Sequence, residues 1–352
     1  MTGAQQQRVP ARLSVSLGLW LDRPADEVLA TAEAAEAAGY PELWIGEMAT
    51  YDAVGLATTI GHRTRDIDLT LGPLAVAVRT PAGMAMAAAS VANLTGRRVG
   101  VALGTSSPVV VERWHGRSRA RGATALRESA AVCRQLLAGE RSHLDGEVVR
   151  SDGFRLRLAP PGGALSVAAF GAAAIRVAAD HADRMVANLV AAEELADLRR
   201  HLDDAVTSRM QRLDPADASR PAPTLAVWVP TAVDPGEDAR EQLRRAIVAY
   251  LAAPGYGQMF ERAGFGDVVA MAREGAHPRE LLAAVPIEMA ETLGAVGSVD
   301  DVLARLDVYA AAGADEVVIV PSATDDDPAG AGTLQAIAAR RDVRSARAAA
   351  PA

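Results

Sequence analysis

The sequence predicts a single (β/α)8 TIM barrel, and three observations favour this fold over a dinucleotide-binding sheet. Eight strand-like segments alternate with helix-like segments along the 352 residues, a pattern that right-handed crossovers arrange as a closed barrel or an open doubly wound sheet. No Gly-x-Gly-x-x-Gly motif follows the first strand-like segment, which argues against a dinucleotide-binding sheet. Half of the residues are apolar and only 4% are aromatic, so small aliphatic side chains must fill a core between helices and a parallel sheet.

Each predicted strand is a short apolar run bounded by turn-forming or polar residues. The eight predicted strands are residues 13–20, 41–45, 67–78, 99–103, 165–170, 184–189, 224–229 and 316–320. The helices begin and end at recognisable signals, such as Pro24 at the start of the first and Gly39 at its end. The eight predicted helices are residues 24–39, 53–63, 81–94, 121–137, 173–182, 193–213, 237–251 and 299–312.

Two segments do not fit the repeating pattern and are predicted to be insertions in one domain of residues 11–340. Residues 140–160 contain Asp145-Gly146 and Asp152-Gly153, which are typical of hairpin turns. Residues 253–290 form a mixed insertion rich in Gly and Pro. We expect residues 1–10 to be a disordered tail and residues 341–352 to be a frayed C-terminus.

Composition excludes several classes of function. The formal net charge of −8 argues against nucleic acid as a partner, and the lack of an 18-residue apolar run argues against a membrane span. Cys133 is the sole cysteine, which excludes an internal disulfide, and no histidines have the spacing of metal ligands. All 36 basic side chains are arginine, so lysine Schiff-base, pyridoxal and P-loop chemistries are excluded. A cytoplasmic enzyme without a metal is the expectation.

The stretch from Arg79 to Gly116 carries most of the chemical signal. A helix and a Gly-Arg turn lead into the buried strand 99–103, and a polar loop, Gly104-Thr105-Ser106-Ser107, follows at once. A strand end of this kind offers hydroxyl and backbone N–H groups to a polar ligand, and in a barrel it lies on the catalytic face. The alternative is a serine-rich turn that caps the next helix.

The order of these pieces resembles the luciferase-like oxidoreductases, and most closely the branch that uses coenzyme F420, a deazaflavin. The resemblance extends from about residue 12 to residue 340 and includes Ala37-Ala38-Gly39-Tyr40, Leu43-Trp44-Ile45-Gly46-Glu47, Arg79-x-Pro81, Leu103-Gly104-x-Ser106 and Trp114-His115-Gly116. It implies a bacterial-luciferase-like barrel whose cofactor lies across the carboxyl ends of the strands. It also implies a small-molecule substrate and a homodimer.

The resemblance implies cofactor contacts from several loops. Gly72-Pro73 matches a bulge in the third strand where a cis peptide supports the cofactor ring, the alternative being an ordinary trans proline. Residues of the loop after the fourth strand would line the polar edge of the ring, and those after the fifth and sixth strands would bind its phosphate through a helix N-terminus. The implied cofactor-binding residues are Gly72, Pro73, Gly104, Thr105, Ser106, Ser107, Phe170, Gly171, Ala172 and Asn188.

Three features depart from the family pattern around these sites, and one is Ser107, where relatives often carry a glutamate. The phosphate region lacks one family glycine, replaced here by Arg184, so a plain βα turn is the alternative there, with Arg184 or Arg176 as substitute donors. Relatives that oxidise alcohols often place a histidine after the acid at Glu47, but this chain has Met48, which cannot relay a proton.

The candidate catalytic residues are therefore Glu47 as an acid and His115 as an alternative, unless His115 only packs beside Trp114. Arg79 could face the acidic tail of the cofactor or pair with a carboxylate at the barrel rim. The function predicted from these residues is an F420-dependent oxidoreductase that transfers a hydride to or from a small organic substrate. The alternatives are an FMN-dependent monooxygenase of the same fold and a non-redox or binding protein that has lost the acid/base residues.

Overall fold

The structure is a computed structural model that describes residues 11–18, 23–212, 219–253 and 255–341. The predicted tail of residues 1–10 and nearly all of the predicted frayed segment, residues 342–352, lie outside the described residues. So does the end of the first predicted strand, beyond residue 18.

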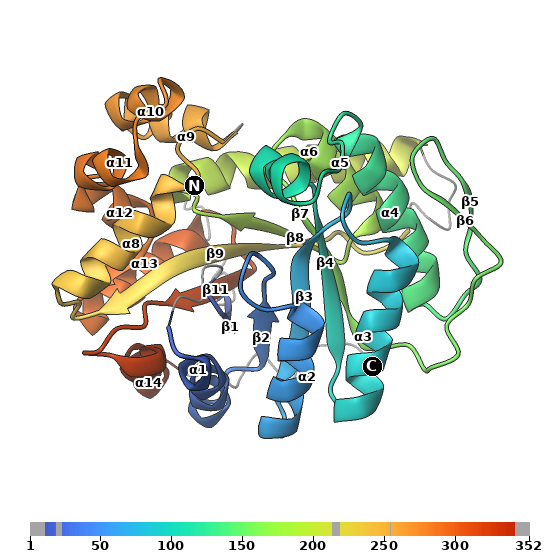
Figure 1. Cartoon of the computed structure of the whole chain (residues 1–352), viewed down its shortest axis with the longest axis horizontal. Coiled ribbons are helices and arrows are strands. Elements are labelled where there is room, and N and C mark those ends of the chain that lie inside the picture. The colour runs from blue at the N-terminus through green and yellow to red at the C-terminus, as the bar shows by residue number, and fades with distance from the viewer. Residues whose placement is uncertain (1–10, 19–22, 213–218, 254, 342–352) are drawn as a thin grey trace, which may run out of the picture.

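Eight parallel strands close into a barrel, as the sequence predicts (Figure 1). The barrel order is β11-β1-β2-β3-β4-β7-β8-β9, and the pairing of β9 with β11 closes it. The strands are β1 Arg12–Ser16, β2 Glu42–Ile45, β3 Asp68–Ala75, β4 Val99–Gly104, β7 Gly162–Ala168, β8 Arg184–Asn188, β9 Thr224–Val233 and β11 Glu316–Pro321. Their burial on both faces explains the continuous apolar runs that the sequence shows.

Helices surround the barrel, and most begin and end within one or two residues of their predicted limits. They are α1 Ala25–Ala38, α2 Ala53–Arg63, α3 Pro81–Thr95, α4 Gly122–Leu137, α5 Ala172–His181, α6 Ala192–Arg212, α8 Glu237–Val248, α13 Val299–Ala311 and α14 Ala331–Arg340. Gly39 ends α1 with a left-handed φ of 90°, and Asp52 caps α2 by accepting bonds from two backbone N–H groups. Helix α14 and the six-residue π-helical turn η1, Val109–Trp114, are not among the helices that the sequence predicts.

Both predicted insertions project from the barrel. The first contains the antiparallel pair β5 His143–Asp145 and β6 Arg150–Asp152, which extends to the right in Figure 1. The second contains α9 Tyr256–Arg262, α10 Gly266–Arg273, α11 Pro278–Ala284 and α12 Ile287–Leu293, grouped beside α8. The short strand β10 Ala295–Gly297 follows and pairs with the far end of β9. The predicted strand 224–229 ends before Pro230, so this extension and β10 are not predicted from the sequence.

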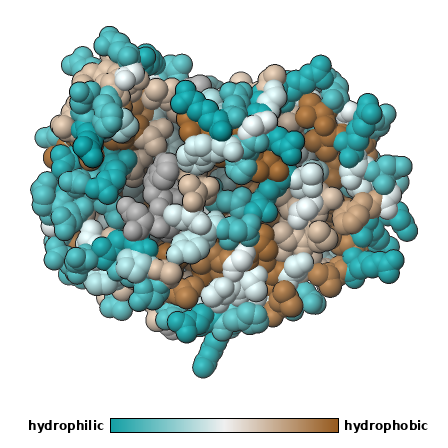
Figure 2. Space-filling model, viewed as in Figure 1, coloured by the Kyte–Doolittle hydropathy of each residue, from teal (hydrophilic) through white to brown (hydrophobic). Residues whose placement is uncertain are grey.

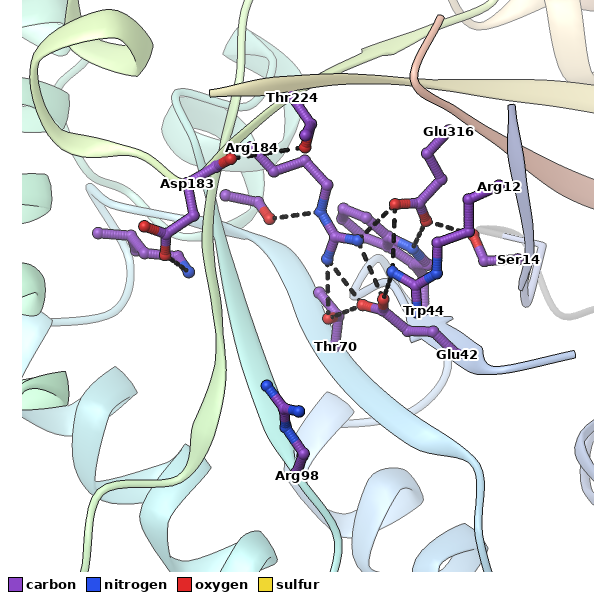
Figure 3. A network of polar contacts seen from close by, with 12 residues as sticks. Arg12, Ser14, Glu42, Trp44, Thr70, Arg98, Asp183, Arg184, Thr224 and Glu316 are labelled. Atoms are coloured by element: carbon purple, nitrogen blue, oxygen red, sulfur yellow. Dashed lines mark hydrogen bonds and ion pairs between the residues drawn. The ribbon is translucent and has the colours of Figure 1, made fainter. Parts of the chain in front are cut away.

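A buried ion network fills the amino-terminal half of the barrel (Figure 3). Arg184 donates to Glu42 at 2.7 Å and to Glu316 at 2.7 Å, and Arg12 lies 2.9 Å from Glu42. These residues begin β8, β2, β11 and β1, so four separate strands meet in one cluster with no net charge. Burial alone would raise the pKa of Glu42, but the Arg184 guanidinium outweighs it and lowers that pKa to about 2.

This network corrects one expectation from the sequence. Arg184 is only 4% exposed at the first residue of β8, at the opposite end of the barrel from the loops that follow the strands. It cannot serve as a phosphate donor there. Its guanidinium instead lies 4.2 Å from the centre of the Trp44 ring, which in turn contacts the edge of Trp228 at a centroid distance of 5.8 Å.

Candidate active site

A cavity of about 620 Å³ opens at the carboxyl ends of β1, β8, β9 and β11. Trp228 lies at its floor inside the barrel and rests on the Trp44 ring above the ion network. Helices α1, α8 and α11 supply the outer wall. In (β/α)8 enzymes the carboxyl-terminal face carries the active site, so this cavity is the candidate substrate chamber.

The cavity wall is mainly apolar, with polar side chains spread around it. Its apolar members include Leu17, Val28, Leu189, Leu243, Val248, Leu282 and Val320. Its polar members are Ser16, Arg23, Glu27, Thr31, Asn188, Gln242, Arg245, Tyr250, Arg279 and Ser322. Of the residues implied by the family resemblance, Asn188 alone lines this cavity. The other lining residues are not predicted from the sequence, because they come from segments far apart in the chain and carry no motif.

The remaining cofactor candidates gather on the neighbouring strands β3, β4 and β7. The Gly72–Pro73 peptide is cis, which confirms that part of the expectation, and Gly72 has a φ of 114°. A Cβ atom on Gly72 would lie 2.4 Å from the carbonyl oxygen of Ala102, so glycine alone fits there. A Cβ atom on Gly104 would lie 3.3 Å from Pro73 and 3.7 Å from Ala168. These glycines therefore allow β3, β4 and β7 to pack closely together beside the cis peptide.

The two serines of the loop after β4 have different surroundings. Ser107 accepts a hydrogen bond from the Val110 N–H at 3.3 Å and so caps the turn Val109–Trp114, which supports the capping alternative for this residue. Ser106 is exposed and has a φ of 55°, a left-handed conformation that costs a non-glycine residue about 1 kcal/mol. Its hydroxyl has no partner among the described residues. Thr105 lies next to Gly122, at the start of α4.

The loops after β7 and β8 are joined by aromatic side chains from α9 and from the segment between α8 and α9. Phe170 packs on Tyr256 with ring centroids 4.5 Å apart, and Tyr256 packs on Tyr250 at 4.8 Å. Asn188 is hydrogen-bonded to both tyrosine hydroxyls, and burial raises the pKa of Tyr250 to about 12. Gly171 lacks a side-chain cap at the start of α5, so the first N–H groups of this helix are left for another acceptor.

Glu47 follows β2, but its carboxylate is already engaged. The Arg79 Nε donates to it at 2.8 Å, the other guanidinium nitrogen forms a second bond, and the Ala53 N–H donates at 3.1 Å. Arg79 also pairs with Asp52. The structure therefore supports the second expectation for Arg79, that it pairs with a carboxylate at the rim of the barrel.

His115 ends the turn that Ser107 caps, and its side chain is exposed beside Trp114, itself 47% exposed. Neither His115 nor Glu47 lines the cavity. Within the described ranges, no cluster of three or more His, Cys, Asp or Glu side chains could hold a metal ion. None of the helices in the described part of the chain is long and apolar enough to cross a membrane.

A closed parallel barrel with a cavity and polar loops at the carboxyl ends of its strands is the architecture of the (β/α)8-barrel enzymes. The family model for luciferase-like monooxygenases matches residues 4–316. The chain therefore belongs to that family and is an oxidoreductase.

Individual relatives agree with this assignment. The 5,10-methylenetetrahydromethanopterin reductase of Archaeoglobus fulgidus is 24% identical over 293 residues, which cover 81% of this chain and 86% of that protein. The coenzyme F420-dependent tetrahydromethanopterin reductase structure from Methanopyrus kandleri has a TM-score of 0.77 at 18% identity and covers 94% of this chain and 98% of that one. The oxygenating constituent of a 3,6-diketocamphane monooxygenase from Pseudomonas putida, solved with FMN, has a TM-score of 0.65 at 16% identity. The similarity covers 93% of this chain and 96% of that one.

Proposed function

We propose that this protein is an F420-dependent oxidoreductase that transfers a hydride between the deazaflavin and a small organic substrate. The observation that carries the proposal is the division of the carboxyl-terminal face into two halves. Small residues on β3, β4 and β7 adjoin a cis peptide on one side, and a mainly apolar cavity occupies the side of β8, β9, β11 and β1. A flat cofactor ring on the first half would present one face to a substrate in the second.

The chain's own groups fit a deazaflavin. Gly72 and Gly104 keep β3, β4 and β7 closely packed around the cis peptide. The Ser106 hydroxyl, which has no partner among the described residues, suits a ring carbonyl or nitrogen. The uncapped start of α5, at Gly171 and Ala172, suits a phosphate. Thr105, Ser107, Phe170 and Asn188 complete this proposed site by positioning the loops that carry these groups.

When bound, the cofactor would supply a two-electron hydride transfer, and the protein would supply position and surroundings. Ser106 would orient the ring, the cavity wall would exclude water, and Asn188 would hold Tyr250 and Tyr256 at the boundary between the halves. We propose that Glu47 donates the proton to the substrate, with the exposed His115 as the alternative donor. Glu47 would have to release one Arg79 bond to act.

Cofactor titration followed by anaerobic turnover tests this function. We expect micromolar binding of F420, weaker binding of FMN, and turnover of ketones, enones or alcohols that survives removal of oxygen. Tight FMN binding with product formed only in the presence of oxygen would overturn the proposal. Failure to bind either cofactor would instead favour a barrel that has lost its redox role.

The second candidate is an FMN-dependent monooxygenase. It is favoured by the similarity of the fold to the diketocamphane monooxygenase component solved with FMN. This reaction would need oxygen and a source of reduced flavin. The same titration separates the two candidates, because they predict opposite cofactor preferences.

We also propose that the protein is a cytoplasmic homodimer that binds neither nucleic acid nor membrane. Met86 and Leu94 on α3 are 53% and 61% exposed, and Figure 2 shows apolar surface over this helix and near the β5–β6 hairpin. Exposed apolar side chains that gather in this way commonly mark a contact between proteins. Light scattering at micromolar concentration should give twice the mass of the chain, and a monomer would contradict the proposal.

A further inference from the structure

We propose that the cavity binds an apolar organic acid and that Arg279 holds its carboxylate. This names the substrate class for the site proposed above and rests on that function for the reaction, though not for binding. The inference comes from the charges around the cavity. Three arginines line it, and they differ in whether a carboxylate of the protein already occupies them.

Two of the three guanidinium groups are neutralised within the protein. Arg23 pairs with Glu27 at 2.6 Å and with Asp325 at 2.7 Å. Arg245 pairs with Glu241 one helical turn before it. Arg279, exposed at the start of α11, has no side-chain hydrogen bond or ion pair within the described ranges. It is the cavity arginine left for a ligand.

One unpaired guanidinium matches one negative charge. Its planar fork donates two parallel hydrogen bonds to a carboxylate, whereas a phosphate dianion would require more positive charge than this wall leaves unpaired. The Glu27 carboxylate does not compete for Arg279, because it is held by Arg23, whose hydrogen bond lowers the pKa of Glu27. A monocarboxylate is therefore the anion that the wall fits.

The other side chains of the cavity wall indicate that the rest of the ligand is apolar. Leu282 lies one turn beyond Arg279 on α11, and Leu243, Leu189 and Val320 continue the apolar surface to Trp228 inside the barrel. Helix α11 stands outside the barrel, at the upper left of Figure 1, whereas β9 carries Trp228 within it. A ligand anchored on Arg279 thus directs its apolar end toward the strand ends, next to the half of that face where the cofactor ring is proposed to lie.

Binding of octanoate and its neutral analogue octanamide to the cofactor-free protein tests the inference. Isothermal titration should show that octanoate binds about tenfold more tightly, the effect of one partly exposed charged hydrogen-bond pair. Arg279→Gln should abolish this preference and leave octanamide binding unchanged. The matched control is Arg157→Gln, which removes an exposed arginine outside the cavity and should retain the preference. F420 affinity is measured separately on each variant.

The possible results separate this inference from the proposed function. Equal binding of octanoate and octanamide, or a preference that survives Arg279→Gln, would overturn the inference even if F420 binds. Tighter binding of octyl phosphate than of octanoate would reject the carboxylate in favour of a phosphate. A loss of F420 affinity in Arg279→Gln, with the octanoate preference intact, would assign Arg279 to the cofactor instead. Conversely, the carboxylate preference would stand even if F420 fails to bind.

Discussion

Replacing Arg184 by methionine removes the centre of the buried network while keeping a long side chain in its place. Arg184 donates to Glu42 and Glu316, to the Ser166 hydroxyl at 3.1 Å and to the Thr70 hydroxyl at 3.3 Å. The variant leaves two buried carboxylates with only Arg12 as a cationic partner. Breaking a buried ion pair from one side typically costs about 3–5 kcal/mol, and we expect Arg184→Met to reduce the free energy of unfolding by that amount at pH 7.

Urea unfolding followed by tryptophan fluorescence and circular dichroism measures this loss. Arg98→Met is the control, because Arg98 lies near the same end of the barrel (Figure 3) but is exposed and, among the described residues, bonds only the Gly162 carbonyl, at 2.9 Å. Its loss should cost about 1 kcal/mol or less. Equal costs for the two variants would refute the reasoning.

Two further measurements test the network: the pH dependence of its stability, and the stability of a variant that loses both glutamates together with Arg184. The lowered pKa of Glu42 contributes stability that is present above its unfolded value of 4.5 and is lost as the pH falls toward about 2. The difference between wild type and Arg184→Met should therefore shrink across this interval. Replacing Glu42 and Glu316 by leucine together with Arg184→Met removes the stranded charges. That triple variant should recover most of the lost stability, since apolar residues often replace buried ion networks without penalty.

Three other changes test the site and the pH response. Ser106→Ala should weaken F420 binding several-fold without changing the melting temperature, whereas Ser107→Ala should lower the melting temperature by removing a cap; the reverse pattern would exchange their roles. Glu47→Gln should reduce anaerobic turnover about a hundredfold if Glu47 delivers the proton, while an unchanged rate would rule it out. Burial lowers the pKa of half-buried His181 from 6.5 to about 4. The free energy of unfolding should therefore decrease by less than about 3 kcal/mol as the pH is lowered from 6.5 to about 4, and His181→Gln should remove this decrease.

The barrel could be predicted because its signals are local and repeated. Buried parallel strands are apolar on both faces, and a glycine such as Gly39 marks a helix end within a residue. The extension of β9 was missed because Pro230 reads as a strand end, although a proline is tolerated where its missing N–H is not needed.

The site was only partly predictable. The family resemblance drew attention to Gly72–Pro73 and to the loop that contains Ser106, because these positions carry glycine, proline and hydroxyl signals. Arg279 carries no such signal, since one arginine among many becomes informative only when the partners of the others are known. The error at Arg184 has a different origin. The predicted strand 184–189 already begins at this residue, which places it at the opposite end of the barrel from the phosphate loops, but the expectation followed the family motif instead of this position.

The pairing of the extended strand β9 with β10 makes the segment between these two strands exchangeable. Residues 231–233 of β9 pair with residues 295–297 of β10, so the two ends of the intervening segment are held together by the sheet itself. That segment, α8 through α12, supplies much of the cavity wall, including Gln242, Tyr250 and Arg279. The strand ends proposed to hold the ring lie outside it. A lineage of such enzymes could therefore exchange this one segment and acquire a new substrate while keeping its cofactor, and a chimaera that joins the segment of a relative at these two strands would reproduce that step in the laboratory.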